Sequence, residues 1–265
     1  FYAAAVQPDG RIIAGGSVYQ GTTAGNDYLL VRYNADGSVD TTFADPPGGG
    51  GILKGYGGTA EHVRGIFLQG SKVVAAGGGR FLAVRYNADG TLDTSFGEMG
   101  IARHGTEGEA FAVTTRPDGR LVLAGIAEVA LADGGTEPGL KVVQYTADGA
   151  LDTSFGTGGV VRYPVLVWVK GVVVEPSGKL AIYGTDHFRP TVVRLSSSGE
   201  LDPSFGTNGV LRMEDHNLPV LETIYSGQQA VWFDGRLWFA DTGQGEGEQG
   251  VINGSGVIVD SVPLQ

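Results

Sequence analysis

The chain alternates short apolar runs with polar, glycine-rich turns along its whole length. The runs are rich in Val, Ile, Tyr and Phe, and Gly, Pro and Asp-Gly bound them. Such runs are typical of β-strands. No segment keeps the 3.6-residue period of an amphipathic helix. We therefore predict an all-β protein with almost no helix.

Two motifs recur in a fixed order along the chain. The first is a polar turn followed by Arg or Lys and an apolar run. It reads PDGRIIAGG at 8–16, GSKVVAAGG at 70–78, PDGRLVLAG at 117–125, PSGKLAIYG at 176–184 and FDGRLWFAD at 233–241. The second motif reads NADGSVDTTFA at 34–44, NADGTLDTSFG at 87–97, TADGALDTSFG at 146–156 and SSSGELDPSFG at 196–206.

A repeat of about 50 residues matches one four-stranded propeller blade. Five copies of the first motif predict an all-β, five-bladed β-propeller of four-stranded antiparallel blades. In each blade the first motif forms a tight hairpin turn. The Asp of the second motif caps its own turn, and its Phe wedges between neighbouring blades. We expect one domain over 1–265, with blades at about 1–58, 59–106, 107–165, 166–216 and 217–265.

The PDGR-apolar run, the RYNADGxLDxSFG segment and the trailing GxxGxxR resemble the bacterial delta-60 repeats, a β-propeller family. The resemblance covers almost the whole chain. The fifth copy departs most, because INGSGVIVD at 252–260 keeps only the Gly and the apolar–Asp ending. The resemblance implies a propeller and no particular activity, since propellers include both enzymes and binding proteins.

Charge and composition narrow the range of partners. The net charge of −11 argues against nucleic acid, which requires a basic surface, and against anionic membranes. No apolar run reaches the roughly 18 residues of a membrane-spanning helix. The chain has no Cys, hence no thiolate metal ligand and no cysteine nucleophile. It opens at Phe1 without an initiator Met, so we expect a piece of a longer chain that carries further domains.

The predicted strand order separates the repeated turns from the variable loops. The variable loops are the crossings between blades and the loops between second and third strands. Repetition indicates scaffold and divergence permits a binding site, so we place the site on the variable loops. Aromatic rings there suit a sugar, whose C–H face stacks on a ring while polar groups bind its hydroxyls. The expected ligand-binding residues are Trp168, Tyr163, Tyr56, Arg64, Lys170 and Gln228.

All four histidines also fall in the variable loops, together with acids. Imidazoles and carboxylates bind divalent metals and carry out acid–base chemistry. Their spacing matches no H-x₃-H or HExxH motif, and solvated loop histidines are the competing interpretation. The candidate metal ligands are His62, His104, His187 and His216, and the candidate catalytic residues are Glu61, His62, Glu109 and Glu214.

Two functions remain open from the sequence, beside a third interpretation in which the chain is a scaffold segment of a longer protein with no small-molecule site. The first is a non-catalytic binding module, secreted or on the cell surface, whose partner is a glycan or another small ligand. The alternative is a metal-assisted hydrolase or lyase with a divalent metal ion as cofactor. Neither interpretation involves nucleic acid or insertion into a membrane.

Overall fold

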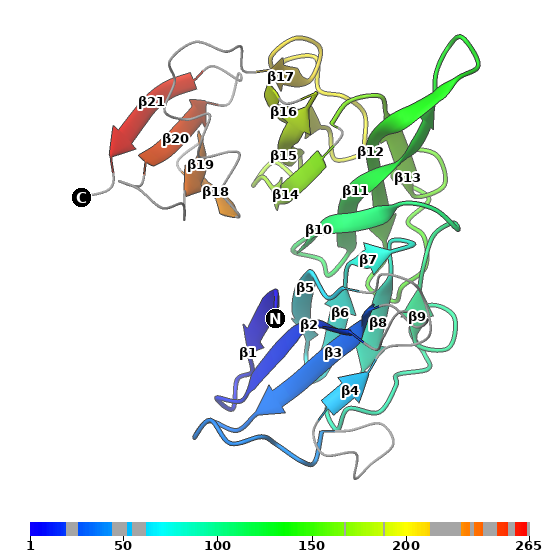
Figure 1. Cartoon of the computed structure of the whole chain (residues 1–265), viewed down its shortest axis with the longest axis vertical. Helices are drawn as coiled ribbons and strands as arrows, with labels where there is room; N and C mark the ends of the chain where they lie inside the picture. Colours follow the sequence, from blue (N-terminus) through cyan, green and yellow to red (C-terminus); the bar gives the residue numbers. More distant parts are fainter. Residues whose placement is uncertain are drawn as a thin grey trace. The chain divides into compact units, whose positions relative to one another are not determined.

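The chain folds into β-strands joined by turns (Figure 1). The computed structural model describes residues 1–19, 26–43, 52–54, 62–166, 168–187, 189–212, 229–233, 236–240, 248–253 and 258–263. Those ranges contain no helix, and therefore none that is long and apolar enough to cross a membrane. Two compact units divide the chain. Unit 1 comprises Phe1–Leu123 and Val143–Asp152, and unit 2 comprises Ala124–Val142 and Thr153–Gln265.

Unit 1 holds two four-stranded antiparallel sheets. The first has the order β1-β2-β3-β4, and the second has the order β5-β6-β8-β9. The strands of the first sheet are β1 (Ala3–Val6), β2 (Ile12–Tyr19), β3 (Asn26–Tyr33) and β4 (Ile52–Lys54). Those of the second are β5 (Gly65–Gln69), β6 (Lys72–Ala76), β8 (Ala83–Tyr86) and β9 (Ile101–Ala102).

Unit 2 holds two further four-stranded sheets, with the orders β14-β15-β16-β17 and β18-β19-β20-β21. The first contains β14 (Trp168–Val174), β15 (Leu180–Asp186), β16 (Arg189–Leu195) and β17 (Val210–Arg212). The second contains β18 (Gln229–Phe233), β19 (Arg236–Ala240), β20 (Glu248–Asn253) and β21 (Ile258–Pro263).

The remaining sheet has five strands, in the order β13-β12-β11-β10-β7. Its strand β7 comes from the second repeat, between β6 and β8, and pairs antiparallel with β10 through Glu109↔Gly79 and Ala110↔Gly78. The strands are β7 (Gly78–Gly79), β10 (Glu109–Thr115), β11 (Leu121–Ala130), β12 (Thr136–Tyr145) and β13 (Val160–Tyr163).

The all-β prediction is confirmed, and the prediction of five four-stranded blades is wrong. The described residues form four such blades. The difference from the predicted blade pattern begins after β6, where Gly77 and Gly78 adopt positive φ angles of 125° and 76°. Glycine enters this region without steric cost. The backbone therefore turns out of its own sheet, and residues that the sequence interpretation treated as a loop become a strand of the next sheet.

The Asp of the second motif closes its own turn, as predicted, and also joins a buried ion pair. Asp93 Oδ1 accepts hydrogen bonds from the N–H and hydroxyl of Ser95, at 3.2 and 2.7 Å. Asp93 Oδ2 accepts from Arg85 Nε and Lys72 Nζ, each at 2.6 Å. Burial opposes ionisation of Asp93, but the hydrogen bonds from Lys72, Ser95 and Arg85 outweigh it and hold its pKa well below the usual range. Asp40 repeats the arrangement with Thr42, Arg11 and Arg32, and Asp202 repeats it with Ser204, Lys179 and Arg194.

The third repeat exchanges the positions of an arginine and a glutamine. Where the second repeat has Arg85 on its third strand, the third repeat has Gln144, whose Nε2 donates to Asp152 Oδ2 at 2.7 Å. Arg116, which precedes the first turn of that repeat, donates from Nε to Gln144 Oε1 at 2.6 Å. Both side chains are buried. The third repeat thus keeps one buried guanidinium, which donates to the glutamine that in turn donates to the aspartate.

The second and third copies of the second motif also bind the turn of the following repeat. The N–H of Gly97 donates to the carbonyl oxygen of Asp148 at 2.7 Å. The buried ring of Phe96 packs on Gly149, where a Cβ atom would come within 2.8 Å of it. The predicted Phe wedge is therefore confirmed, and it requires glycine at the facing turn. The next junction repeats the contacts with Gly156, Ser198, Phe155 and Gly199.

Candidate functional site

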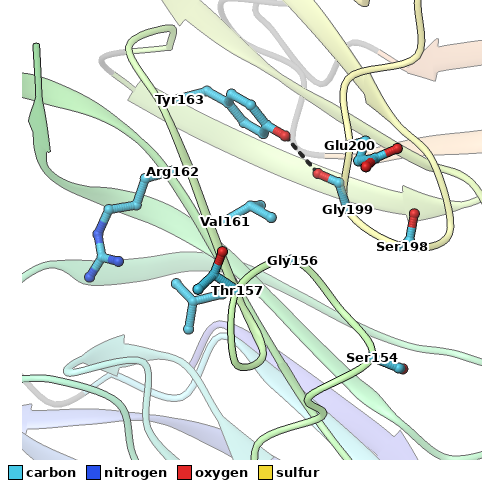
Figure 2. A pocket seen from close by; sticks show the side chains of 10 residues that line it. Ser154, Gly156, Thr157, Val161, Arg162, Tyr163, Ser198, Gly199 and Glu200 are labelled. Carbon is cyan, nitrogen blue, oxygen red and sulfur yellow. Dashed lines mark hydrogen bonds between the residues drawn. The ribbon is translucent and has the colours of Figure 1, made fainter. Parts of the chain in front are cut away.

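A pocket of about 500 Å³ opens in unit 2 where the second motif of the third repeat meets the following turn (Figure 2). The loop before β13 and the strand itself form one side. The turn after β16 forms the other. The lining residues are Ser154, Gly156, Thr157, Val160, Val161, Arg162, Tyr163, Ser198, Gly199 and Glu200.

Backbone hydrogen bonds set the shape of this pocket. Gly156 donates from its N–H to the carbonyl oxygen of Ser198 at 2.7 Å, and Thr157 donates to Val160 at 2.9 Å. Gly156 has a φ of 54°, and a Cβ atom there would lie 2.4 Å from the carbonyl oxygen of Val160. Only glycine fits this position without strain. The loop therefore folds back along β13 and ties the two sides together at one end.

Tyr163 forms an anchored aromatic wall. Its hydroxyl donates to the carbonyl oxygen of Gly199 at 2.8 Å, drawn as a dashed line in Figure 2. Burial raises the pKa of the phenol, and the negative charge of Glu200 adds to that effect, although a backbone hydrogen bond at Leu201 opposes it. The side chain is thus a neutral phenol at physiological pH, and its hydrogen bond holds the half-buried ring in place.

The rest of the lining combines an apolar floor with a polar rim. Val160 and Val161 are buried. Arg162 and Glu200 are exposed and carry opposite charges, and in Figure 2 their charged groups lie on opposite sides of the view. The hydroxyls of Ser154, Thr157 and Ser198 complete the rim. The lining residues thus have no net formal charge, which suits a polar ligand without net charge.

The preceding junction offers an internal comparison with the pocket. Its scaffold positions have the same residue types, so the repeats share the loop geometry. The shared pairs are Ser95 and Ser154, Gly97 and Gly156, Arg103 and Arg162, and Gly149 and Gly199. The differing pairs are Glu98 and Thr157, Ile101 and Val160, Ala102 and Val161, His104 and Tyr163, Asp148 and Ser198, and Ala150 and Glu200. The aromatic wall and part of the polar rim therefore occupy the positions that distinguish this junction.

Of the predicted ligand-binding residues, Tyr163 lines the pocket. Trp168 is 49% exposed and lies on β14 with Lys170 Nζ 5.7 Å from its ring centroid, and neither residue lines the pocket. Arg64 belongs to unit 1, where its guanidinium lies 3.7 Å from Glu109. Tyr56 and Gln228 lie outside the described residues.

The predicted metal ligands are not assembled within the described ranges. His62 packs edge-on against Tyr2, with ring centroids 5.9 Å apart. His104 donates its backbone N–H to Arg80 at 2.9 Å. His187 Nδ1 lies 3.0 Å from an oxygen of Asp186, whose other oxygen accepts from Arg212 Nε at 2.6 Å. No group of three or more His, Asp or Glu residues suited to a metal occurs in these ranges. Glu61, Glu214 and His216 lie outside them.

Sequence reasoning missed most of the pocket because it assigned the repeated turns to scaffold. The pocket lies at two of these turns, and Ser154, Thr157, Arg162, Ser198 and Glu200 were not predicted. The signal was present within the repeats. A position-by-position comparison of the junctions would have set Tyr163 against His104 and Glu200 against Ala150.

The model of the family described as "Domain of unknown function (DUF5122) beta-propeller" matches residues 7–43, 69–96, 116–155 and 175–205, about half of the chain. It matches four of the repeats. This match confirms the prediction of a β-propeller family. It does not confirm that the family is that of the delta-60 repeats. No curated protein sequence matches the chain.

Solved structures resemble the chain in fold at low identity. A protein of unknown function from Bacteroides caccae is 14% identical with a TM-score of 0.44, over 73% of this chain and 58% of that chain. A polysaccharide lyase is 13% identical with a TM-score of 0.42, over 93% and 56%. A glucose dehydrogenase is 12% identical with a TM-score of 0.52, over 99% and 86%. The chain thus covers less than two thirds of the first two proteins, and the likeness to the third concerns the fold alone.

Proposed function

The chain belongs to the family of DUF5122 β-propellers, and we propose that it binds an uncharged carbohydrate in the pocket around Tyr163, without acting on it chemically. One observation carries the proposal. An anchored tyrosine ring faces a space whose rim holds three hydroxyls, one guanidinium and one carboxylate. We also propose a secreted or cell-surface location, where such a ligand would be a glycan.

The lining matches the two kinds of surface that a sugar presents. The C–H face of a pyranose packs on an aromatic ring, and its hydroxyls both donate and accept hydrogen bonds. Glu200 accepts, Arg162 donates, and the hydroxyls of Ser154, Thr157 and Ser198 do both. The volume of about 500 Å³ falls within the usual range of ligand sites, roughly 300–1,000 Å³.

The test is a glycan array on the purified chain, followed by calorimetric titration of each glycan that binds. Tyr163→Ala removes the wall, and we expect at least about tenfold weaker binding, equivalent to about 1.4 kcal/mol. Tyr163→Phe keeps the ring but loses the hydrogen bond to Gly199. We expect a smaller loss for this variant. Glu200→Gln keeps an acceptor without the charge, so binding of an uncharged sugar should persist.

The chain supplies two matched controls. His104→Ala changes the equivalent position of the preceding junction and should leave affinity unchanged. Trp168→Ala removes an exposed ring outside the pocket and should do the same. If Trp168→Ala abolished binding while Tyr163→Ala did not, the site would lie on β14. The absence of any glycan ligand on the array would refute carbohydrate binding.

A further inference from the structure

Four side chains of unit 1 gather around the guanidinium of Arg64. We call Tyr2, His62, Arg64, Glu109 and Phe111 the Arg64 cluster. The Cζ atom of Arg64 lies 4.9 Å from the ring centroid of Tyr2 and 5.8 Å from that of Phe111. Aromatic rings attract a cation over their faces, so these two rings stabilise the guanidinium at this point. His62 packs against Tyr2 and contributes to the same surroundings.

The backbone gives Arg64 a prepared position. The Arg64 N–H donates to the carbonyl oxygen of Ala76 at 2.8 Å. Its side chain then passes over Gly77, where a Cβ atom would lie 2.6 Å from both Cβ and Cγ of Arg64. The positive φ of Gly77, 125°, also starts the crossing of β7. The glycine therefore both redirects the chain and leaves room for the arginine.

Arg64 keeps hydrogen-bonding capacity in this position. Its Nε has no hydrogen-bond partner but is buried, so an incoming ligand would meet the Nη groups. The carboxylate oxygen of Glu109 stands 3.7 Å from Nη2, within ion-pair range but longer than a hydrogen bond. The side chains of Arg64 and Glu109 are 26% and 27% exposed, so solvent and small solutes reach them. A guanidinium has five N–H donors in a planar fork.

We propose that the Arg64 cluster is a binding site for a carboxylate ligand, distinct from the sugar pocket of unit 2. A carboxylate matches the fork of a guanidinium with two parallel hydrogen bonds. Tyr2 and Phe111 flank the guanidinium and would contact the apolar part of the ligand. Glu109 is the competitor, because its negative charge already faces the same cation.

The competition makes binding depend on pH. Burial raises the pKa of Glu109, although Arg64 opposes the shift, so Glu109 takes up a proton more readily than an ordinary glutamate. Burial and the charge of Arg64 lower the pKa of His62, so this imidazole is neutral at pH 7 and adds no positive charge. Affinity should therefore rise as the pH falls toward the raised pKa of Glu109, and decline at lower pH when the ligand itself is protonated.

The experiment titrates the chain with glucuronate and with N-acetylglycine, using glucose as the uncharged probe. Wild-type protein should bind at least one carboxylate at concentrations up to about 10 mM, and glucose should not compete. Binding of both carboxylates means that the carboxylate group suffices. Binding of glucuronate alone identifies a sugar acid as the ligand. If neither binds, the proposal fails.

Three variants test whether Arg64 binds the carboxylate and whether Glu109 competes with it. Glu109→Gln removes the competitor, and we expect about tenfold tighter binding with a weaker pH dependence. Arg64→Met should abolish binding, and Arg64→Lys should weaken it because the planar fork is lost. Arg103→Gln, an exposed arginine of the same unit, is the control and should change nothing. Thermal unfolding checks that each variant is folded. Unchanged or weaker binding by folded Glu109→Gln, or unchanged binding by folded Arg64→Met, would overturn the assignment.

Discussion

Replacing Asp93 by Asn tests how the repeated aspartates hold each blade together. Asp93 and Arg85 are 7% and 8% exposed in their side chains, and the ion pair that joins them is 2.6 Å long. An asparagine retains the shape and can still accept from Ser95. It leaves the guanidinium of Arg85 buried, with only the exposed carboxylate of Asp148, 3.8 Å away, as a counter-charge. Breaking a buried pair in this way costs about 3–5 kcal/mol.

The third repeat provides the matched control. In Asp152→Asn the buried side chain that donates a hydrogen bond to the carboxylate is the neutral Gln144, although the charge of Asp152 also acts on the buried Arg116. The charged partner Arg120 has a side chain 36% exposed and keeps a 2.6 Å contact with Asp118. The loss is then mainly that of charge-assisted hydrogen bonds, about 1.5–3 kcal/mol. Asp93→Asn should therefore destabilise the chain by roughly 2 kcal/mol more than Asp152→Asn.

Urea unfolding followed by far-ultraviolet circular dichroism measures both variants against wild type. Equal slopes of the unfolding free energy against urea would show that the same surface is exposed in each case. If Asp152→Asn cost as much as Asp93→Asn, the buried charge of Arg85 would not be the source of the destabilisation.

Two further predictions concern the same network. Burial opposes ionisation of Asp40, Asp93 and Asp202, but hydrogen bonds outweigh it and hold their pKa values well below the usual range. These aspartates therefore contribute fully to stability above the ordinary Asp pKa of about 3.9. Their contribution is lost as the pH falls through the folded pKa values. The melting temperature should stay level from pH 7 to about 5 and fall below about 4, and Asp93→Asn should flatten that fall. The double variant Arg116→Gln/Gln144→Arg should be better tolerated than either single variant. Arg116→Gln alone removes the buried guanidinium, and Gln144→Arg alone places a second guanidinium beside the first. Urea midpoints of the two single variants and the double variant measure this coupling, and strict additivity would contradict it.

The turn chemistry could be predicted because it is local. Asp93 caps the N–H of Ser95, only two residues along the chain. The ion pair with Arg85 was not predicted, although its eight-residue separation recurs between Arg32 and Asp40 and between Arg194 and Asp202. Arg85 lies on β8, the strand that precedes the motif, and propensity alone does not predict such a pairing.

The pocket and the five-stranded sheet depend on contacts between distant segments. The pocket requires Gly156 to meet Ser198, and β7 requires Gly77 and Gly78 to turn toward β10. A glycine in the sequence shows that such angles are allowed, but not which strand the chain then meets. For this reason the blade pattern was predicted in outline, while the number of four-stranded blades was wrong.

The strand that the second repeat contributes to the third repeat's sheet has a consequence for protein engineering. Gly78 and Gly79 pair with Ala110 and Glu109, so a cut between the two repeats separates hydrogen-bonded partners. A shortened or permuted version divided near residue 107 would lose those bonds and leave an open strand edge, a known starting point for aggregation. The transferable building block therefore begins before Gly77, inside what the sequence marks as the preceding repeat.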